Sequence, residues 1–300
     1  MISVTHTDLG CPLRDNLAAA GNAEVSLWWL GQAGFIFSRN GIRILIDPYL
    51  SDSLAIKYEG EEFAHRRMMQ PPVTPDELNG LNWVFCTHAH SDHMDPGTLP
   101  ILAKNNHDCR FVVPRAEAST ALARGIPHDR MVLVDAGETV DLGCKMDAEA
   151  LPAAHEELAR DQNGHLRYLG YHLRLGDCSF YHSGDCVPYE GLDQHLARIK
   201  ADVALLPVNG RNEYLRSRKI LGNFTIPEAV GLCKKSAVPV LVAHHWGMFD
   251  FNTASAEALK AGADSALPEV NFIIPNPSTR YEFRQEARAI LAGSEKENRQ

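Results

Sequence analysis

One seven-residue stretch constrains this chain more than any other. Residues 87–93 read Thr-His-Ala-His-Ser-Asp-His, so three histidines and one aspartate fall within six positions. Each of these four side chains is a good ligand for a first-row metal ion. In an extended segment, residues two apart point to the same side, which places His88, His90 and Asp92 on one face. His93 follows where the chain can turn, so it reaches the same point from another side.

The flanking residues place this stretch at the end of a strand. Residues 81–86 form an apolar run typical of a buried strand, and Asp95-Pro96-Gly97 indicates a turn or a helix start. A polar surface loop is the alternative interpretation, but it does not account for so dense a pattern directly after a strand. The sequence therefore predicts a metal site at a strand end.

Composition narrows the class of protein. The 300 residues are 45% hydrophobic, enough for a sizeable core, and the formal net charge of −9 argues against a nucleic-acid groove. The seven cysteines include no Cys-x-x-Cys pair, so neither a disulfide framework nor a thiolate zinc site is expected. Because no basic leader or long apolar run is present, we expect a cytoplasmic protein with no membrane segment.

Two predicted hairpins have the same layout. The first, at 35–46, turns at Asn40-Gly41, a strong hairpin signal, and leads to Asp47. The second, at 168–182, leads to Asp185 in the same way. Two hairpins that each deliver an aspartate at a strand end hint at an internal duplication.

The rest of the chain alternates helices with strands and has no linker rich in Pro, Ser or Gly. The periodicity predicts helices at 100–106, 116–124 and 226–234, and strands at 25–30, 111–113, 131–134, 201–207 and 238–243. We therefore predict a single domain over residues 1–300, with a core at about 24–285. Residues 1–23 are expected to be a loose N-terminal arm, and 295–300 a charged C-terminal tail.

Further metal ligands are expected at other strand ends. His155 follows a run of small residues, Asp185 follows a glycine, and His244 and His245 follow an apolar strand. The residues alone leave His244 and His245 as alternatives. Asp47 is expected instead to accept a hydrogen bond from the free ring nitrogen of a liganding histidine. The other histidines receive no functional role, among them His6, His65, His107, His128 and His195.

Taken together, these residues resemble the motifs of the metallo-β-lactamase fold superfamily. Its central His-x-His-x-Asp-His motif stands at 88–93, and its other motifs match Asp47, His155, Asp185 and His245 in order, within a resemblance that runs from Trp28 to Phe249. Within the superfamily, the chain is most similar to the group that contains L-ascorbate-6-phosphate lactonase. The segments that carry this second resemblance are 28–35, 207–211, 221–223, 245–249 and 252–253.

The resemblance implies an α/β fold, a four-layer αββα sandwich with its metals at one edge. It implies that His88, His90 and His155 hold a first metal, that Asp92, His93 and His245 hold a second, and that Asp185 bridges them. His245 is preferred to His244 because Trp-Gly-Met-Phe follows it. The resemblance also favours a homo-oligomer.

Imidazole and carboxylate ligands without thiolate suit one or two divalent ions, Zn²⁺ or Mn²⁺, with Fe²⁺ a further candidate. A bound metal lowers the pKa of a water molecule from 15.7 to about 7. The expected chemistry is therefore attack of a metal-bound hydroxide on an ester-like carbonyl. Asp92 would orient this nucleophile or take its proton.

A locally basic loop at 209–219 is the predicted substrate-binding element. Arg211 is the expected anion ligand because arginine suits bidentate capture of phosphate or carboxylate, and Asn209 and Asn223 would assist it. A solvated loop or a subunit contact is the alternative. A phosphorylated sugar or sugar-acid lactone would fit such a site.

Three functions follow from this interpretation. The favoured one is a metal-dependent hydrolase of a small, anionic lactone or related ester, with no nucleic-acid or membrane partner. A metal-dependent phosphodiesterase of a small phosphodiester is the second. The third is a non-catalytic or redox member of the fold that only binds metal, since the fold does not decide the function.

Overall fold

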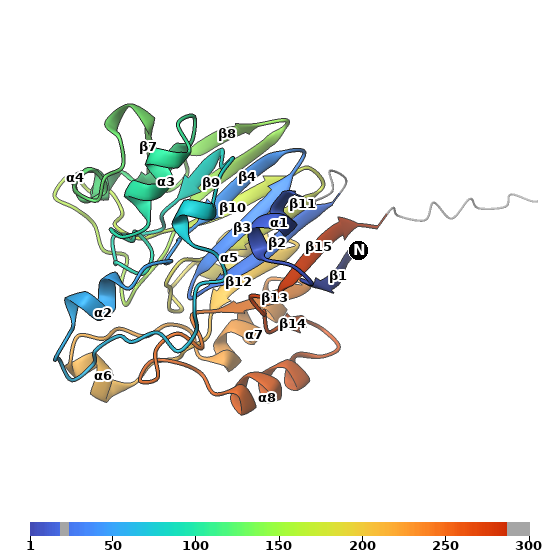
Figure 1. Cartoon of the computed structure of the whole chain (residues 1–300). Coiled ribbons are helices and arrows are strands. Elements are labelled where there is room, and N and C mark those ends of the chain that lie inside the picture. Colours follow the sequence, from blue (N-terminus) through green and yellow to red (C-terminus); the bar gives the residue numbers. More distant parts are fainter. Residues whose placement is uncertain (19–23, 287–300) are drawn as a thin grey trace, which may run out of the picture.

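The computed structural model describes residues 1–18 and 24–286, which build two β-sheets that pack face to face (Figure 1). Strands of the first sheet lie in the order β1 (Ile2–Asp8), β15 (Thr279–Gln285), β2 (Val25–Gly31), β3 (Gly34–Arg39), β4 (Ile42–Ile46), β5 (Trp83–Phe85), β6 (Arg110–Pro114) and β7 (Met131–Val134). Strands of the second sheet lie in the order β14 (Asn271–Ile273), β13 (Val240–His244), β12 (Val203–Pro207), β11 (Cys178–His182), β10 (Leu169–Leu175), β9 (Met146–Pro152) and β8 (Thr139–Gly143).

Helices cover the outer faces of both sheets and two short helices stand at one end of the sandwich (Figure 1). Their bounds are α1 (Leu13–Ala18), α2 (Ser53–Lys57), α3 (Leu99–Asn105), α4 (Ala118–Ala123), α5 (Leu192–Ile199), α6 (Glu213–Ser217), α7 (Ile226–Lys235) and α8 (Ala256–Ala266). Single 3₁₀ turns are at Pro75–Glu77, Arg115–Glu117 and His128–Arg130. Within the described residues, no helix is both long and apolar enough to cross a membrane.

Three hydrophobic clusters correspond to the three interfaces between four layers. The cluster between the sheets contains Phe37 of β3 and Phe180 of β11. A second cluster packs α1, α3 and α4 on the outer face of the first sheet, and a third packs α5, α7 and α8 on the second. The predicted α/β architecture, a four-layer αββα sandwich, is therefore confirmed.

Both predicted hairpins are present. β3 and β4 pair antiparallel around Asn40 (φ 50°) and Gly41 (φ 77°), the left-handed pair that a type I′ turn requires. β10 and β11 form the second hairpin. In each sheet the hairpin is followed by parallel strands, β5 to β7 in one and β12 to β14 in the other. This shared order of strands agrees with the suggested duplication.

The N-terminal segment is not a loose arm. β1 pairs antiparallel with β15 over seven residue pairs, from Ile2 and Gln285 to Asp8 and Thr279. The side chains of Leu13 and Leu17 in α1 are buried against the first sheet. A strand whose partner lies more than 270 residues away has no local signal, and this explains why the sequence prediction was wrong here. The predicted C-terminal tail lies outside the described residues.

The strands bring several chain segments to one edge of the sandwich. β4 and β5 run parallel in the first sheet, and β9, β11 and β13 run in one common direction in the second. Parallel strands present their carboxyl ends at the same edge, where ligand sites of α/β folds are built. The residues after these five strands are therefore the ones to examine for function.

Phe180 tests the interface between the sheets. Its ring lies 5.2 Å from Phe37 and 5.2 Å from Phe283 of the opposite sheet, both edge-on, and it is fully buried. Replacing Phe180 by Ala removes a large buried ring, so the free energy of unfolding should fall by about 3–5 kcal/mol in urea denaturation. The control, Leu267→Ala at an exposed position, should change it by no more than about 0.5 kcal/mol. A smaller loss for Phe180→Ala than for the control would contradict this packing.

Candidate metal centre

Seven side chains meet at this edge and form two adjacent groups. Within each group, one ligand atom per residue lies within 4.8 Å of all the others: His88, His90, His155 and Asp185 in the first, and Asp92, His93 and His245 in the second. Asp185 also reaches the second group, because its carboxylate oxygens lie 3.2 Å from Nε2 of His93 and 3.2 Å from Nε2 of His245. The structure thus brings together every side chain that the sequence proposes as a metal ligand, in the predicted grouping.

The route by which the central motif reaches the centre differs from the expected one. Residues 87–94 are bends and turns rather than extended chain, and the amides of His93 and Met94 both donate to the carbonyl of His90. Asp92 therefore does not share a face with His88 and His90 but belongs to the other group. A tight turn, and not the alternation of side chains along a strand, therefore directs the side chains of the 88–93 motif toward one centre.

Asp47 lies behind this centre, as predicted. It follows β4, is fully buried, and its Oδ2 accepts a hydrogen bond from Nδ1 of His93 at 2.7 Å. The same carboxylate accepts from the backbone amide of Thr87 at 2.8 Å and from its hydroxyl at 2.6 Å. Because Nδ1 of His93 carries the proton, Nε2 is the nitrogen directed at Asp185.

Charge is concentrated in this buried centre. Although burial opposes protonation, the carboxylates of Asp185, Asp47 and Asp92 raise the pKa of His93 well above its usual range. In the same way Asp185 and Asp92 raise the pKa of His245 to about 9. Burial instead lowers the pKa of His88 well below its usual range and that of His155 to about 4. The carboxylates thus favour the protonated forms of His93 and His245, whereas burial favours the neutral forms of His88 and His155.

Several buried ligand atoms lack a protein partner. Nε2 of His88 has no hydrogen-bond partner within the described part of the chain, and Nε2 of His93 and Oδ1 of Asp185, which lie 3.2 Å apart as an ion pair, form no hydrogen bond to any other described residue. Buried polar atoms without partners are rare because they are costly, so such a cluster is explained by a bound group. Neutral imidazoles and carboxylates are the ligands of Zn²⁺, Mn²⁺ and Fe²⁺. The residues therefore fit one or two divalent ions.

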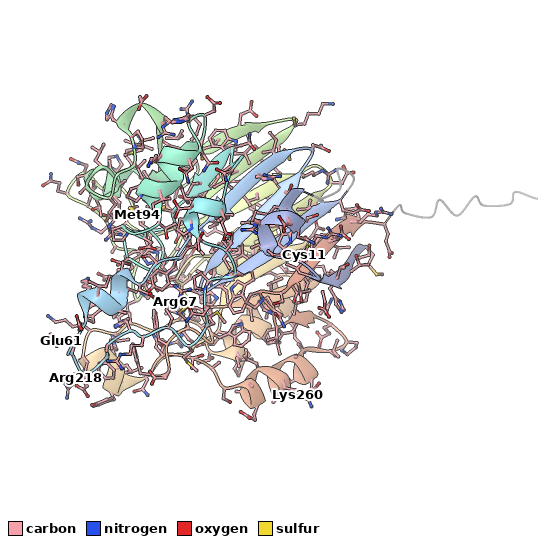
Figure 2. All side chains as sticks on the ribbon, in the orientation of Figure 1. Cys11, Glu61, Arg67, Met94, Arg218 and Lys260 are labelled. Carbon is pink, nitrogen blue, oxygen red and sulfur yellow. The ribbon has the colours of Figure 1, made fainter. Side chains whose placement is uncertain are left out.

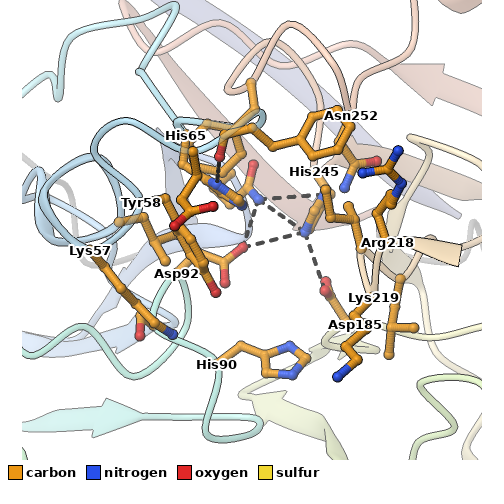
Figure 3. A pocket seen from close by; sticks show the side chains of 18 of the residues that line it. Lys57, Tyr58, His65, His90, Asp92, Asp185, Arg218, Lys219, His245 and Asn252 are labelled. Carbon is orange, nitrogen blue, oxygen red and sulfur yellow. Dashed lines mark hydrogen bonds and ion pairs between the residues drawn. The ribbon is translucent and has the colours of Figure 1, made fainter. Parts of the chain in front are cut away.

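The structure distinguishes the two neighbouring histidines. His245 (φ 59°) points into the centre, as Figure 3 shows beside Asp92 and Asp185. His244 is fully buried in the opposite direction and stacks on His182, with ring centroids 4.8 Å apart. Its two ring nitrogens have no hydrogen-bond partner among the described residues. This placement supports the preference for His245.

Gln32 is a residue of the centre to which the sequence analysis assigned no role. Its side-chain Nε2 donates to Oδ2 of Asp92 at 2.8 Å and lies 2.9 Å from Nε2 of His245. Its backbone carbonyl accepts a hydrogen bond from the backbone amide of His245 at 3.0 Å. Gln32 is buried and has a positive φ of 48°. The available signal was its place between glycines in the 28–35 segment, where a tight turn aims one polar side chain at the centre.

A cavity of about 630 Å³ opens over both groups of ligands, with His90, His155 and Asp185 of the first and Asp92 and His245 of the second in its lining. Leu54, Tyr58, Phe63, Phe249 and Ile220 contribute apolar surface to it, and Lys57, Arg124, Arg218 and Lys219 contribute positive charge. Figure 2 labels Glu61 and Arg218 at the end of the molecule where α2 and α6 lie, and both residues line this cavity. The wall is thus built mostly by two segments, 54–65 and 218–221.

Arg211 does not reach this cavity. Its guanidinium forms an ion pair with Glu228 and donates to the carbonyl of Asn223 at 2.9 Å, and it lines a separate hollow with Glu156 and Arg216. The structure therefore contradicts the expected placement of Arg211 over the centre. The basic loop does contribute to the cavity, but through Arg218 and Lys219 at its far end, where Lys219, two residues after the end of α6, has a φ of 63°.

Asn209 and Asn223 also lie outside the cavity. The Nδ2 group of Asn223 donates to Asn209 at 3.1 Å, and Asn209 donates in turn to Oδ1 of Asn252 at 2.8 Å. Only Asn252 of these three lines the cavity. The structure thus places Asn209 and Asn223, which were predicted to assist Arg211, in a hydrogen-bonded chain behind Asn252 and not on the cavity wall.

Comparison with known proteins agrees with this geometry. Residues 42–246 match the family model described as a beta-lactamase superfamily domain. The chain belongs to this superfamily. A metal-dependent hydrolase of Myxococcus xanthus is 27% identical over 268 residues, which cover 87% of this chain and 84% of that protein. A metal-dependent hydrolase of Caldivirga maquilingensis is 29% identical over 184 residues, 61% of this chain and 70% of that one.

Solved structures with other activities have a similar fold. An isothiocyanate hydrolase from Delia radicum gut bacteria superposes with a TM-score of 0.68 at 19% identity, over 87% of this chain and 99% of that one. The diiron β-hydroxylase CmlA of Streptomyces venezuelae gives 0.64 at 16% identity, over 89% of this chain and 59% of that one. These identities are low, and the two activities differ, so this likeness establishes the fold and not the reaction.

Replacing each of the two histidines tests the ligand assignment. His245→Ala removes a member of the second group and should lower the affinity for Zn²⁺ by at least about 10-fold, measured by competition with a chromophoric chelator. His244→Phe keeps a planar ring stacked on His182 and should leave that affinity within about 2-fold of the unchanged protein. The opposite order of effects would assign the ligand to His244.

Proposed function

We propose that this protein is a metal-dependent hydrolase that opens an ester-type bond, and specifically a lactone, in a small anionic substrate. The observation that carries the proposal is the position of the two ligand groups on the floor of a cavity with positive side chains on its wall. Such a site joins the groups that activate water to groups that attract an anion.

A bound divalent ion would supply a water molecule of lowered pKa and would polarise the oxygen of the bond under attack. Asp92 is the residue placed to handle the proton of that water. Gln32 donates a hydrogen bond to Oδ2 of Asp92, whereas Oδ1 of Asp92 accepts no hydrogen bond from the described residues. His93 and His245 hold the pKa of Asp92 well below its usual range against the effect of burial, so it is a carboxylate at neutral pH. We therefore assign Asp92 to orienting the nucleophile and accepting its proton at Oδ1.

Positive charge on the cavity wall supports an anionic substrate. Lys57 and Lys219 form no ion pair within the described chain, and in Figure 3 they appear on either side of His90. Arg218 is partly neutralised, since it pairs with Glu62 at 2.7 Å. Lys219 is thus the better replacement for Arg211 as the anion ligand, because its charge is available.

The relatives support the coarser part of this proposal, since both proteins named above are metal-dependent hydrolases. The choice of a phosphorylated sugar lactone rests on the resemblance of the sequence to the ascorbate-6-phosphate lactonase group. A homo-oligomer and a cytoplasmic location stay predictions of the sequence.

The reaction class is tested by metal removal together with a pair of substrates. Protein loaded with Zn²⁺ or Mn²⁺ should hydrolyse 6-phosphogluconolactone at least about 10²-fold faster than bis-p-nitrophenyl phosphate, and chelation or His88→Ala should abolish the enzymatic rate. The reverse preference would favour the phosphodiesterase. Activity that survives both chelation and His88→Ala would exclude a metal-dependent hydrolase.

The anion ligand is tested by a matched pair of variants. Lys219→Ala should raise KM for 6-phosphogluconolactone roughly 5- to 10-fold while changing the rate for uncharged δ-valerolactone little, because only the former needs the ammonium group. Arg211→Ala, from the same loop but outside the cavity, should leave both KM values unchanged. An effect of Arg211→Ala alone would restore the original assignment.

A further inference from the structure

His65 reaches the same cavity from a segment outside all the metal motifs. It lies in the loop after α2 and lines the cavity together with Asp92 and His245. In Figure 3, His65 and His90 appear on opposite sides of Asp92. Neither the ligand groups nor the proposed proton acceptor uses this residue, so its ring is free to contact the substrate.

A hydrogen bond fixes which nitrogen of His65 carries the proton. Nδ1 lies 2.6 Å from the carbonyl oxygen of Phe63, and a carbonyl can only accept, so Nδ1 must donate. Burial lowers the pKa of His65, which keeps the ring neutral at neutral pH. A neutral ring with its proton on Nδ1 presents a lone pair at Nε2. Nε2 has no hydrogen-bond partner within the described residues, so this acceptor is available.

Aromatic side chains hold the ring of His65 in place. Tyr58 stacks on it with centroids 4.4 Å apart, and Phe249 and Phe251 approach edge-on at 5.0 Å and 4.9 Å. The backbone has a positive φ of 46°, a conformation that non-glycine residues rarely adopt. Such a conformation persists only where the surroundings enforce it, and it occurs preferentially at functional sites.

The loop that carries His65 is anchored on both sides. Before it, Glu62 accepts from the hydroxyl of Tyr214 at 2.6 Å and pairs with Arg218 at 2.7 Å. After it, Arg67 donates to the carbonyls of Tyr49 and Ser51 at 3.1 and 3.2 Å. A side chain held from both ends loses little freedom when it binds a ligand, which is a requirement for specific recognition.

We propose that Nε2 of His65 accepts a hydrogen bond from a hydroxyl group of the substrate, and that His65 thereby selects hydroxylated substrates over apolar ones. This inference rests on the proposed hydrolase function of the same cavity and names its substrate class more narrowly, as a polyhydroxy lactone. His65 is a specificity residue in this account, since it exchanges no proton with the reacting atoms. A site built to pair with a hydroxyl rejects an analogue that lacks it.

Two substitutions separate the two ring nitrogens. In His65→Asn, the amide nitrogen takes the place of Nδ1 and can still donate to the carbonyl of Phe63, while nothing replaces Nε2. Asn also tolerates the positive φ of this position. In His65→Gln, the longer amide reaches the place of Nε2 and can offer an acceptor there. Thermal unfolding of both variants checks that the loop and the fold are retained.

The kinetic test uses D-glucono-δ-lactone and δ-valerolactone, which share a six-membered ring and differ in their hydroxyl groups. His65→Asn should lower kcat/KM for D-glucono-δ-lactone roughly 10- to 50-fold and change the value for δ-valerolactone less than about 3-fold. His65→Gln should recover part of the lost preference. An equal loss for both lactones, or no loss for either, would overturn the proposal.

A second measurement does not depend on activity. Nitrogen-15 NMR of histidine-labelled protein, with His65→Asn used to assign the signals, should show Nδ1 of His65 protonated and Nε2 unprotonated at pH 7.5. A proton on Nε2 would overturn the proposal even if the lactones are hydrolysed. Failure of the unchanged protein to hydrolyse any lactone, with this tautomer present, would refute the proposed reaction and also remove the lactone class named here.

Discussion

The hydrogen bonds of one buried carboxylate hold the centre together. Asp47 accepts from the amide and hydroxyl of Thr87 and from Nδ1 of His93, so it ties the end of β4 to the motif that follows β5. Asp47, Asp92 and Asp185 bring three carboxylates into one desolvated region, where an uncompensated charge is costly. Protonated His93 and His245 offset this charge in the protein alone, and a divalent ion would offset it in their place. Metal binding and protonation of these two imidazoles therefore compete, which makes affinity depend on pH.

The sequence reveals this centre well because its parts follow from local rules. The 88–93 motif follows a buried strand, and Asn40-Gly41 defines the hairpin that leads to Asp47. What the sequence does not reveal depends on distant contacts. β1 was missed because its partner is β15, at the other end of the chain. The same limit explains Gln32, whose partners Asp92 and His245 lie 60 and 213 residues away.

The error over Arg211 has a different physical origin. The predicted basic loop does reach the cavity through Arg218 and Lys219, but composition does not say which of its cations lines that cavity. Arg211 pairs with Glu228 in a separate hollow, while Lys219, which has a left-handed backbone, lines the cavity. The direction of a side chain on a loop is decided by such turns and pairs, and not by the charge of the loop.

The sheets and the loops thus have different roles in the site. The strand ends fix the ligands, and the sandwich core makes their positions rigid. The segments around His65 and Arg218 build the cavity wall, and Glu62 joins these two segments by its bonds to Tyr214 and Arg218. This connection links the proposed anion-binding side of the wall to the proposed hydroxyl-binding side. Under the proposed function, a compact substrate with a negative group and hydroxyl groups on one ring would contact both sides at once.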